Sequence, residues 1–251
     1  MAEIIELVFL GIGVGALSGF FGIGGGTILV PALLFIGFGM KTAVGISVVQ
    51  MVFSSIYGSY LNLKKGTLDV KMVLAIGVGG FAGALMSSLI VSALSSRTLE
   101  WIFMGFVLFA LGRMFMHTAD HTPQEMRKAH PALLFAIGMM LGAFSISIGV
   151  GGSILLVPIL AGFLHVPLKN AISAGLFFVV FSSVSGLISL SLGGYIDYYH
   201  GIIIGIASMA GVFGGIWLKH VVSVTQHKIL MIAFYLLVIS YFFYRLVVQH
   251  G

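Results

Sequence analysis

The sequence contains no cysteine and few charged residues, and each shortage excludes a class of protein. Without a thiol among its 251 residues, the chain forms no disulfide, no thiolate metal site and no cysteine nucleophile. Charged residues make up 8% of the chain and hydrophobic residues 59%, with a mean hydropathy of +1.17. A soluble domain carries roughly 25% charged residues, so this chain could not cover a surface that faces water. The composition therefore predicts an integral membrane protein.

The sequence contains eight long apolar runs with very few charged residues. They cover residues 4–38, 42–62, 72–94, 99–116, 132–164, 171–192, 201–218 and 229–248. Most approach or exceed the ~20 residues that a helix needs to cross the hydrocarbon core, and they lack the alternation of membrane β-strands. We therefore expect an all-α, multi-pass protein of the cell membrane with about eight or more transmembrane segments. The formal charge of +5 lies in loops, where it bears on topology, and we expect the lipid bilayer and no nucleic acid as partner.

The chain repeats itself. A shift of 127 residues places Gly22 and Pro31 on Gly149 and Pro158. One further residue in the second copy brings more pairs into register: Ser54 with Ser182, Ser55 with Ser183, Gly58 with Gly186, and Asp69 with Asp197. The pattern predicts two homologous four-segment repeats, residues 1–116 and 132–251, joined by a polar linker at 117–131.

The topology depends on the first apolar run. If residues 4–38 cross the membrane once, the repeats are parallel and the basic residues divide seven to five. If the run enters and returns, the repeats are inverted and nine basic residues face three: Lys41, Arg97 and Arg245. The second division is a proper positive-inside pattern. We favour this re-entrant hairpin because a helix at 27–38 would be roughly 18 Å long, too short for ~30 Å of hydrocarbon.

Two glycine clusters are the sharpest motif, "GFFGIGGGTILVP" at 19–31 and "FSISIGVGGSILLVP" at 144–158. Each would open a returning half-helix whose free N–H groups and positive dipole end face an anion. Paired broken helices in inverted repeats are typical of a transporter's central site. The candidate binding residues are Gly24, Gly25, Gly26, Thr27, Gly151, Gly152 and Ser153. The alternative is close helix packing through small residues, which we predict for Gly11, Gly15, Gly19, Gly79 and Gly83.

Polar residues also lie inside the spans that follow the clusters. Gln50, Ser54 and Ser182 are further candidates for substrate contact, and Gln50 and Ser54 share a helix face. Interhelical hydrogen bonds, or bonds of a serine to its own helix, are an equal alternative. For Asp69 and Asp197, which precede apolar runs, we predict helix N-caps.

No pattern indicates an enzyme. His117 and His121 are spaced like two metal ligands on a helix, but they lie in the polar linker, where solvated residues are expected. No Gly-x-Ser-x-Gly elbow with an acid and a base is present. We expect no catalytic residue, no metal and no cofactor.

The doubled glycine motif and "KTAVGIS" from Lys41 resemble the TauE/SafE sulfite-exporter family over essentially the whole chain. The resemblance implies a secondary transporter for sulfur-containing anions such as sulfite, sulfoacetate or another organosulfonate, with the proton as candidate coupling ion. Combined with the motifs, it predicts alternating access around an anion held near the midplane by the half-helix N-termini. The alternatives are a passive anion channel or permease on the same scaffold, and a non-transporting membrane scaffold. Ser153 stands opposite Gly26, and Ile154 opposite Thr27, so the two half-sites should be unequal.

Overall fold

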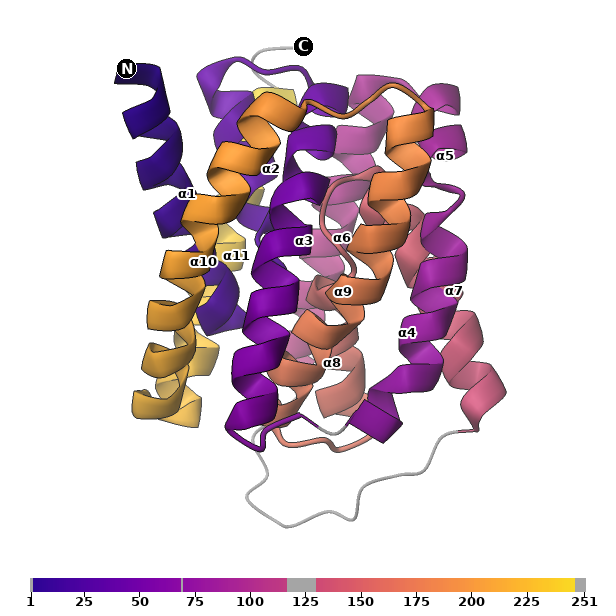
Figure 1. Cartoon of the computed structure of the whole chain (residues 1–251). Helices are drawn as coiled ribbons and strands as arrows, with labels where there is room; N and C mark the ends of the chain where they lie inside the picture. Colours follow the sequence, from indigo (N-terminus) through magenta and orange to yellow (C-terminus); the bar gives the residue numbers. More distant parts are fainter. Residues whose placement is uncertain (1, 69, 117–129, 247–251) are drawn as a thin grey trace.

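The computed structural model describes residues 2–68, 70–116 and 130–246, and within these ranges all regular structure is helical (Figure 1). The helices of the first half are α1 (Ala2–Phe21), α2 (Gly26–Ile36), α3 (Met40–Lys64), α4 (Val70–Ala84), α5 (Ser87–Ala93) and α6 (Ser96–Met116). Those of the second half are α7 (Pro131–Ser147), α8 (Ser153–Phe163), α9 (Leu168–Leu192), α10 (Tyr198–Val221) and α11 (Val224–Tyr244). Of the predicted linker, only residues 130 and 131 are described, and Pro131 begins α7.

The helices confirm a multi-pass membrane protein. Five of them, α1, α3, α9, α10 and α11, are long and apolar enough to cross a membrane. The bent pair α4 and α5 makes a sixth span if its two parts are counted together, while α2, α7 and α8 are shorter apolar helices. The prediction of about eight or more segments therefore holds only when the shorter helices are included.

Both glycine clusters interrupt helices, as the sequence predicts. The first break separates α1 from the 11-residue α2, and the second separates α7 from the 11-residue α8. Figure 1 shows that α1 begins and α2 ends at one end of the bundle, whereas α7 begins and α8 ends at the other. Each broken pair thus returns toward the end from which it started.

The two halves match in helix length and in packing. α2 and α8 each have 11 residues, α3 and α9 have 25, and α6 and α11 have 21. α1 packs along α10 of the other half, and α7 packs along α4, so each broken pair is held by the opposite half. α3 and α9 contact one another at the centre.

One element breaks this correspondence. α4 and α5 are bent by 43° at their junction, whereas their counterpart α10 continues unbroken for 24 residues. Ser185 and Ser189 of α9 donate hydrogen bonds to the carbonyls of Phe81 (2.6 Å) and Leu85 (2.8 Å), and so bind α9 to the residues beside the bend. The first half carries Tyr57 and Leu61 at the aligned positions, so the pair of serines is not repeated there.

Glycines bring the long helices into backbone contact. A side chain at Gly11, Gly15 or Gly19 would meet the backbone of α10, and one at Gly79 or Gly83 would overlap the backbone of α7. The predicted packing role of these five glycines is therefore confirmed. Close backbone approach of this kind is how helices associate in lipid, where the hydrophobic effect between them is absent.

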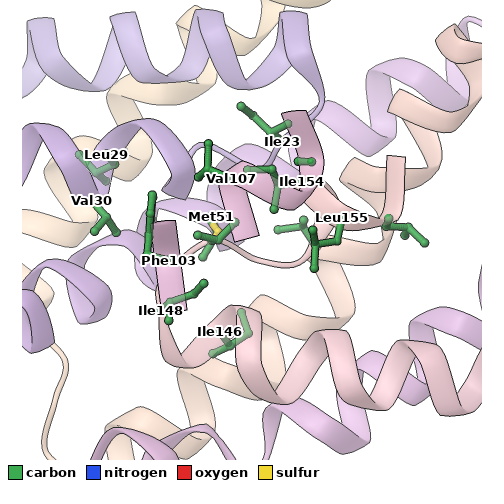
Figure 2. Close-up of a cluster of buried hydrophobic side chains, with 14 of the residues drawn as sticks. Ile23, Leu29, Val30, Met51, Phe103, Val107, Ile146, Ile148, Ile154 and Leu155 are labelled. Carbon is green, nitrogen blue, oxygen red and sulfur yellow. The ribbon is translucent and has the colours of Figure 1, made fainter. Parts of the chain in front are cut away.

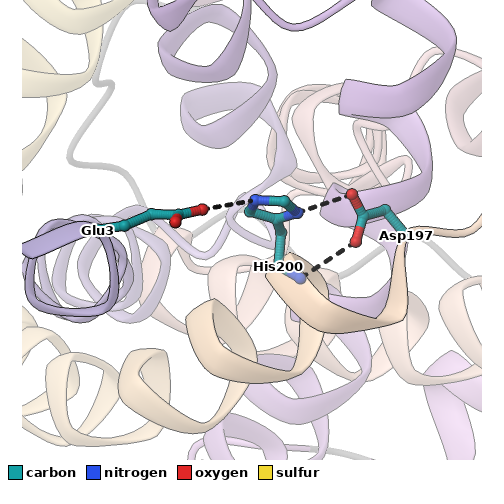
Figure 3. A network of polar contacts seen from close by, with 3 residues as sticks. All are labelled: Glu3, Asp197 and His200. Atoms are coloured by element: carbon teal, nitrogen blue, oxygen red, sulfur yellow. Dashed lines mark hydrogen bonds and ion pairs between the residues drawn. The ribbon is translucent and has the colours of Figure 1, made fainter. Parts of the chain in front are cut away.

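The start of α10 is fixed by a small polar network (Figure 3). Asp197 caps the helix by accepting a hydrogen bond from the backbone N–H of His200 at 3.2 Å, which confirms its predicted N-cap role. The imidazole of His200 lies 2.7 Å from the second oxygen of Asp197 and 3.4 Å from the carboxylate of Glu3. The contact links the first turns of α1 and α10. The aligned Asp69 lies outside the described residues.

We predict that valine at Gly15 destabilises the protein and that valine at Gly13 does not. Valine at position 15 would overlap the Ser208 carbonyl of α10, whereas the exposed Gly13 has no atom within 4 Å of the corresponding position. We expect Gly15→Val to cost about 1–3 kcal/mol or more, as overpacking does, and Gly13→Val to stay within about 0.5 kcal/mol. Thermal unfolding of the purified variants in detergent measures both, and equal stability of the two would contradict the proposed α1–α10 contact.

Candidate functional site

The two helix breaks are built from glycines in the left-handed region. Three positions in each loop have positive φ, and they correspond under the shift of 127: Gly22 (+70°), Gly24 (+75°) and Gly25 (+78°), against Gly149 (+74°), Gly151 (+80°) and Gly152 (+90°). Other residues are strained in this conformation. The glycine pattern therefore encodes the same turn twice.

Each loop leaves backbone donors at the start of a short helix. The carbonyl of Gly25 accepts from the N–H groups of Ile28 (3.0 Å) and Leu29 (2.9 Å). In the residues that the structure describes, no backbone hydrogen bond uses the N–H of Gly26 or Thr27, nor those of Ser153 and Ile154 in α8. Unpaired N–H groups at a helix N-terminus, together with the helix dipole, favour an anion.

The loops lie against one another in the interior. A Cβ on Gly26 would overlap the carbonyl oxygen of Gly149, and that same oxygen accepts a hydrogen bond from Ser47 at 2.8 Å. Ser182 donates to the carbonyl of Gly151 at 2.9 Å. The serines of α3 and α9 thus both satisfy carbonyls of the second loop, which leaves the donors of the helix starts as the open groups.

Buried side-chain polar atoms without partners gather at the same place. Thr27 Oγ1, Ser153 Oγ and both amide atoms of Gln50 have no hydrogen-bond partner, and all three residues are 0% exposed. The Gln50 amide lies against Gly25, with Nε2 2.8 Å from the Cβ position, and Ser153 Oγ lies 3.5 Å from that of Gly24. A buried unpaired polar group costs about 1–3 kcal/mol. Groups left unpaired together indicate a site that a polar ligand completes.

Apolar side chains seal this region from solvent. Figure 2 shows Ile23, Met51, Ile148 and Ile154 in one buried cluster with side chains of α2, α6 and α8. All ten residues predicted to bind substrate are buried. The region around the two glycine loops is therefore closed to solvent in this structure.

The polar side chains are distributed unequally. Gly25 faces the amide of Gln50, whereas Gly152 faces the ring of Phe178, which aligns with Gln50 under the shift of 128. The amide is therefore present at the first loop and replaced by an aromatic ring at the second. The alignment of the two halves already shows Gln50 opposite Phe178. The structure adds that both side chains lie against the glycine loops.

Contacts connect several of the predicted residues: Gln50 lies against Gly25, Ser153 against Gly24, and Ser182 bonds to Gly151. The hydroxyl of Ser54 bonds to the Met51 carbonyl of its own helix at 3.4 Å. The ten candidates omit Ser47, although it is a polar residue inside the same span and lies about one turn before Gln50 on α3, a signal that could have included it. No group of three His, Asp or Glu side chains suited to a metal occurs in the described ranges, and His117 and His121 lie outside them.

A separate cavity of about 370 Å³ lies at the end of the bundle where α3 and α6 begin. Its lining comprises Gly39, Met40, Ser96, Arg97, Glu100 and Arg245. Arg245 is engaged by the buried Glu100 (3.4 Å) and by the Leu34 carbonyl (3.1 Å), so its charge holds α11 against α6 and α2. None of the predicted binding residues lines this cavity.

Comparison with known proteins places the chain among membrane transporters. Residues 7–242 match the family described as "Sulfite exporter TauE/SafE". "Probable membrane transporter protein MJ0441" of Methanocaldococcus jannaschii is 31% identical over 73% of this chain and 70% of its own length. Two Bacillus subtilis proteins are also similar, "Probable membrane transporter protein YunE" (23% identical; 78% and 81% covered) and "Probable membrane transporter protein YdhB" (24%; 84% and 87%). No solved structure matches the chain.

We predict opposite effects on stability at Gln50 and Ser47. Gln50→Leu removes two unpaired buried atoms and should leave the free energy of unfolding unchanged or raise it by about 1 kcal/mol. Ser47→Ala removes the bond to the Gly149 carbonyl and should lower it by about 0.5–1.5 kcal/mol or more. Thermal unfolding without added anion measures both. A clear loss of stability in Gln50→Leu would show that the amide holds the fold together.

Proposed function

Because the chain belongs to the TauE/SafE sulfite exporter family of membrane transporters, we propose that it carries a sulfur-containing anion by alternating access. Sulfite, sulfoacetate and other organosulfonates are the proposed substrates. The observation that carries the proposal is the group of unpaired buried donors at the two glycine loops. The protein is a multi-pass membrane protein and not an enzyme, so this site binds its solute without changing it.

The proposed binding site combines backbone and side-chain donors. The N-termini of α2 and α8 present N–H groups near Gly24, Gly25, Gly26, Gly151 and Gly152 to the anion. The side chains of Thr27, Gln50, Ser153 and Ser182 add neutral polar contacts, and Ser54 lines the approach. Neutral donors together with two helix dipoles suit an anion that must also leave again, because full neutralisation would hold it too tightly.

The proposed movement follows from the two halves. We infer that they are inverted repeats, since the broken pairs start from opposite ends and each packs on the other half (Figure 1). Rocking of one half against the other would open the sealed site to each side in turn. The end at which α3 ends and α9 begins carries most of the basic residues, so we place it in the cytoplasm. The proton remains the candidate coupling ion.

Transport into proteoliposomes tests the proposal. We expect saturable uptake of sulfite or an organosulfonate, accelerated by a proton gradient, and a loss of about ten-fold or more in Gln50→Leu, the effect of one hydrogen bond to a charged group. Ser55→Ala is the matched control on the same helix, because the Ser55 hydroxyl bonds only to its own helix, at the Val52 carbonyl (3.5 Å).

Each other outcome has a definite meaning. Flux that rises linearly with concentration and ignores the proton gradient would indicate the passive channel or permease instead. Absence of both transport and anion-dependent stabilisation would contradict the anion site and leave the non-transporting scaffold.

A further inference from the structure

Lys219, near the end of α10, is fully buried and carries a charge without a charged partner among the described residues. Its ammonium donates hydrogen bonds to Asn62 Oδ1 (2.7 Å) and to Ser173 Oγ (3.1 Å), and both acceptors are neutral. Removing an ammonium from water without a counter-charge is costly. Charged residues inside membrane spans are rare for this reason and mark ion pathways.

The surroundings of Lys219 have donors to spare. The side-chain nitrogen of Asn62 and the hydroxyl of Ser59 are buried without a partner on α3, three residues apart. Thr67 Oγ1 lies 3.0 Å from Ser173 Oγ, and these two hydroxyls donate to the backbone carbonyls of Asn62 (3.2 Å) and Lys169 (3.0 Å). The ammonium, the free amide N–H₂ of Asn62 and the free hydroxyl of Ser59 together provide hydrogen-bond donors and positive charge. This combination suits an oxyanion and repels a cation.

A stripe on α3 connects this cluster to the glycine loops. Ser47, Ser54, Gly58 and Asn62 recur at helical spacing and lie on one face. Ser47 bonds to the second loop at Gly149, and Asn62 bonds to Lys219. All four residues of the stripe are buried. Small and polar side chains thus run from the candidate site toward one end of the bundle.

The symmetry-related position holds no equivalent cluster. Under the shift of 128, Asn62 aligns with Leu190, Ser173 with Gly45 and Lys219 with Val91. Leu190 on α9 and Val91 on α5 are fully buried apolar residues. The fold therefore packs well without an ammonium at this position. The inverted topology assigns Lys219 to the side of the membrane with nine basic residues. The structure buries this side chain, so Lys219 is not a surface charge on that side.

We propose that Lys219, Asn62 and Ser173, here termed the Lys219 site, form a second binding station for the transported oxyanion. The anion supplies the counter-charge that the ammonium lacks, and the amide of Asn62 donates a further hydrogen bond. The station lies at the end where α3 and α10 terminate, so the anion occupies it on its way between the glycine loops and that end. This inference rests on the proposed function for the identity of the anion.

Sulfite and methanesulfonate, titrated into the purified full-length protein, are the probes. We expect Lys219→Gln to weaken the apparent Kd by about ten-fold or more, the effect of losing one charge-assisted hydrogen bond. Asn62→Leu, which installs the residue of the other half, should weaken binding in the same direction. Lys64→Gln is the charge-matched control, because Lys64 is an exposed cation at the same end; its Kd should match that of the wild type.

Stability without anion separates this role from a structural one. An unpaired ammonium destabilises the closed protein, so Lys219→Met should unfold at the same temperature as the wild type or higher. A lysine that holds α10 to α3 through its hydrogen bonds would instead give a lower unfolding temperature in Lys219→Met, and that result would overturn the proposal.

The remaining outcomes distinguish the station from the proposed function. If the wild type binds and transports the anions and Lys219→Gln and Asn62→Leu do so equally well, the Lys219 site is not a station and the transporter proposal stands. If the anions bind without being transported, and Lys219→Gln abolishes that binding while Gln50→Leu retains it, Lys219 forms an anion site, but its role as a station on a transport path and the transporter proposal are both overturned. If no anion binds the wild type, both are overturned.

Discussion

Backbone groups that lipid cannot satisfy are the constraint on which this structure depends. The two glycine loops interrupt helices inside a protein whose exterior is hydrocarbon, and an exposed break would cost several kcal/mol for each open group. Both breaks are therefore buried against one another, between α3 and α9, and closed by the apolar cluster of Figure 2. The flanking contacts of α1 with α10 and of α7 with α4 hold each broken pair against a helix of the other half.

The same constraint concentrates chemistry at the centre. Loops that turn through left-handed glycines leave helix starts with free donors, and the surrounding seal prevents water from pairing them. Serines of α3 and α9 satisfy loop carbonyls, whereas the amide of Gln50 and the hydroxyls of Thr27 and Ser153 find no partner. If stability alone determined these positions, apolar side chains would occupy them and leave no polar atom unpaired. Phe178 occupies the position opposite Gly152 in this way. The unpaired atoms come from both halves: Thr27 and Gln50 lie in the first and Ser153 in the second.

Local patterns predicted much of this from the sequence. The glycine clusters predicted the breaks and a short helix at 27–38, against α2 as observed, and the spacing of Gly11, Gly15 and Gly19 predicted close helix packing, although not that α10 is the partner. Features that depend on a partner from the other half were missed. The residues beside the bend between α4 and α5 bond to serines of α9, and no local signal in residues 70–93 indicates the bend. Likewise the burial of Lys219 depends on α3 and α9, so a charge count assigns it to the surface.

Departures from symmetry therefore carry more functional information than the symmetry itself. Matching glycines and prolines in the two halves maintain two broken helices, and a scaffold without any substrate would need them equally. Gln50 aligns with Phe178, and Lys219 aligns with Val91. The apolar residue of each pair is buried at the equivalent position. Packing therefore does not require the polar residue of either pair. Gln50 lies on α3 beside the first glycine loop, and Lys219 bonds to Asn62 near the last turn of α3. A carrier whose two ends face different solutions has reason to be unequal along this path, since an anion must be captured at one end and released at the other.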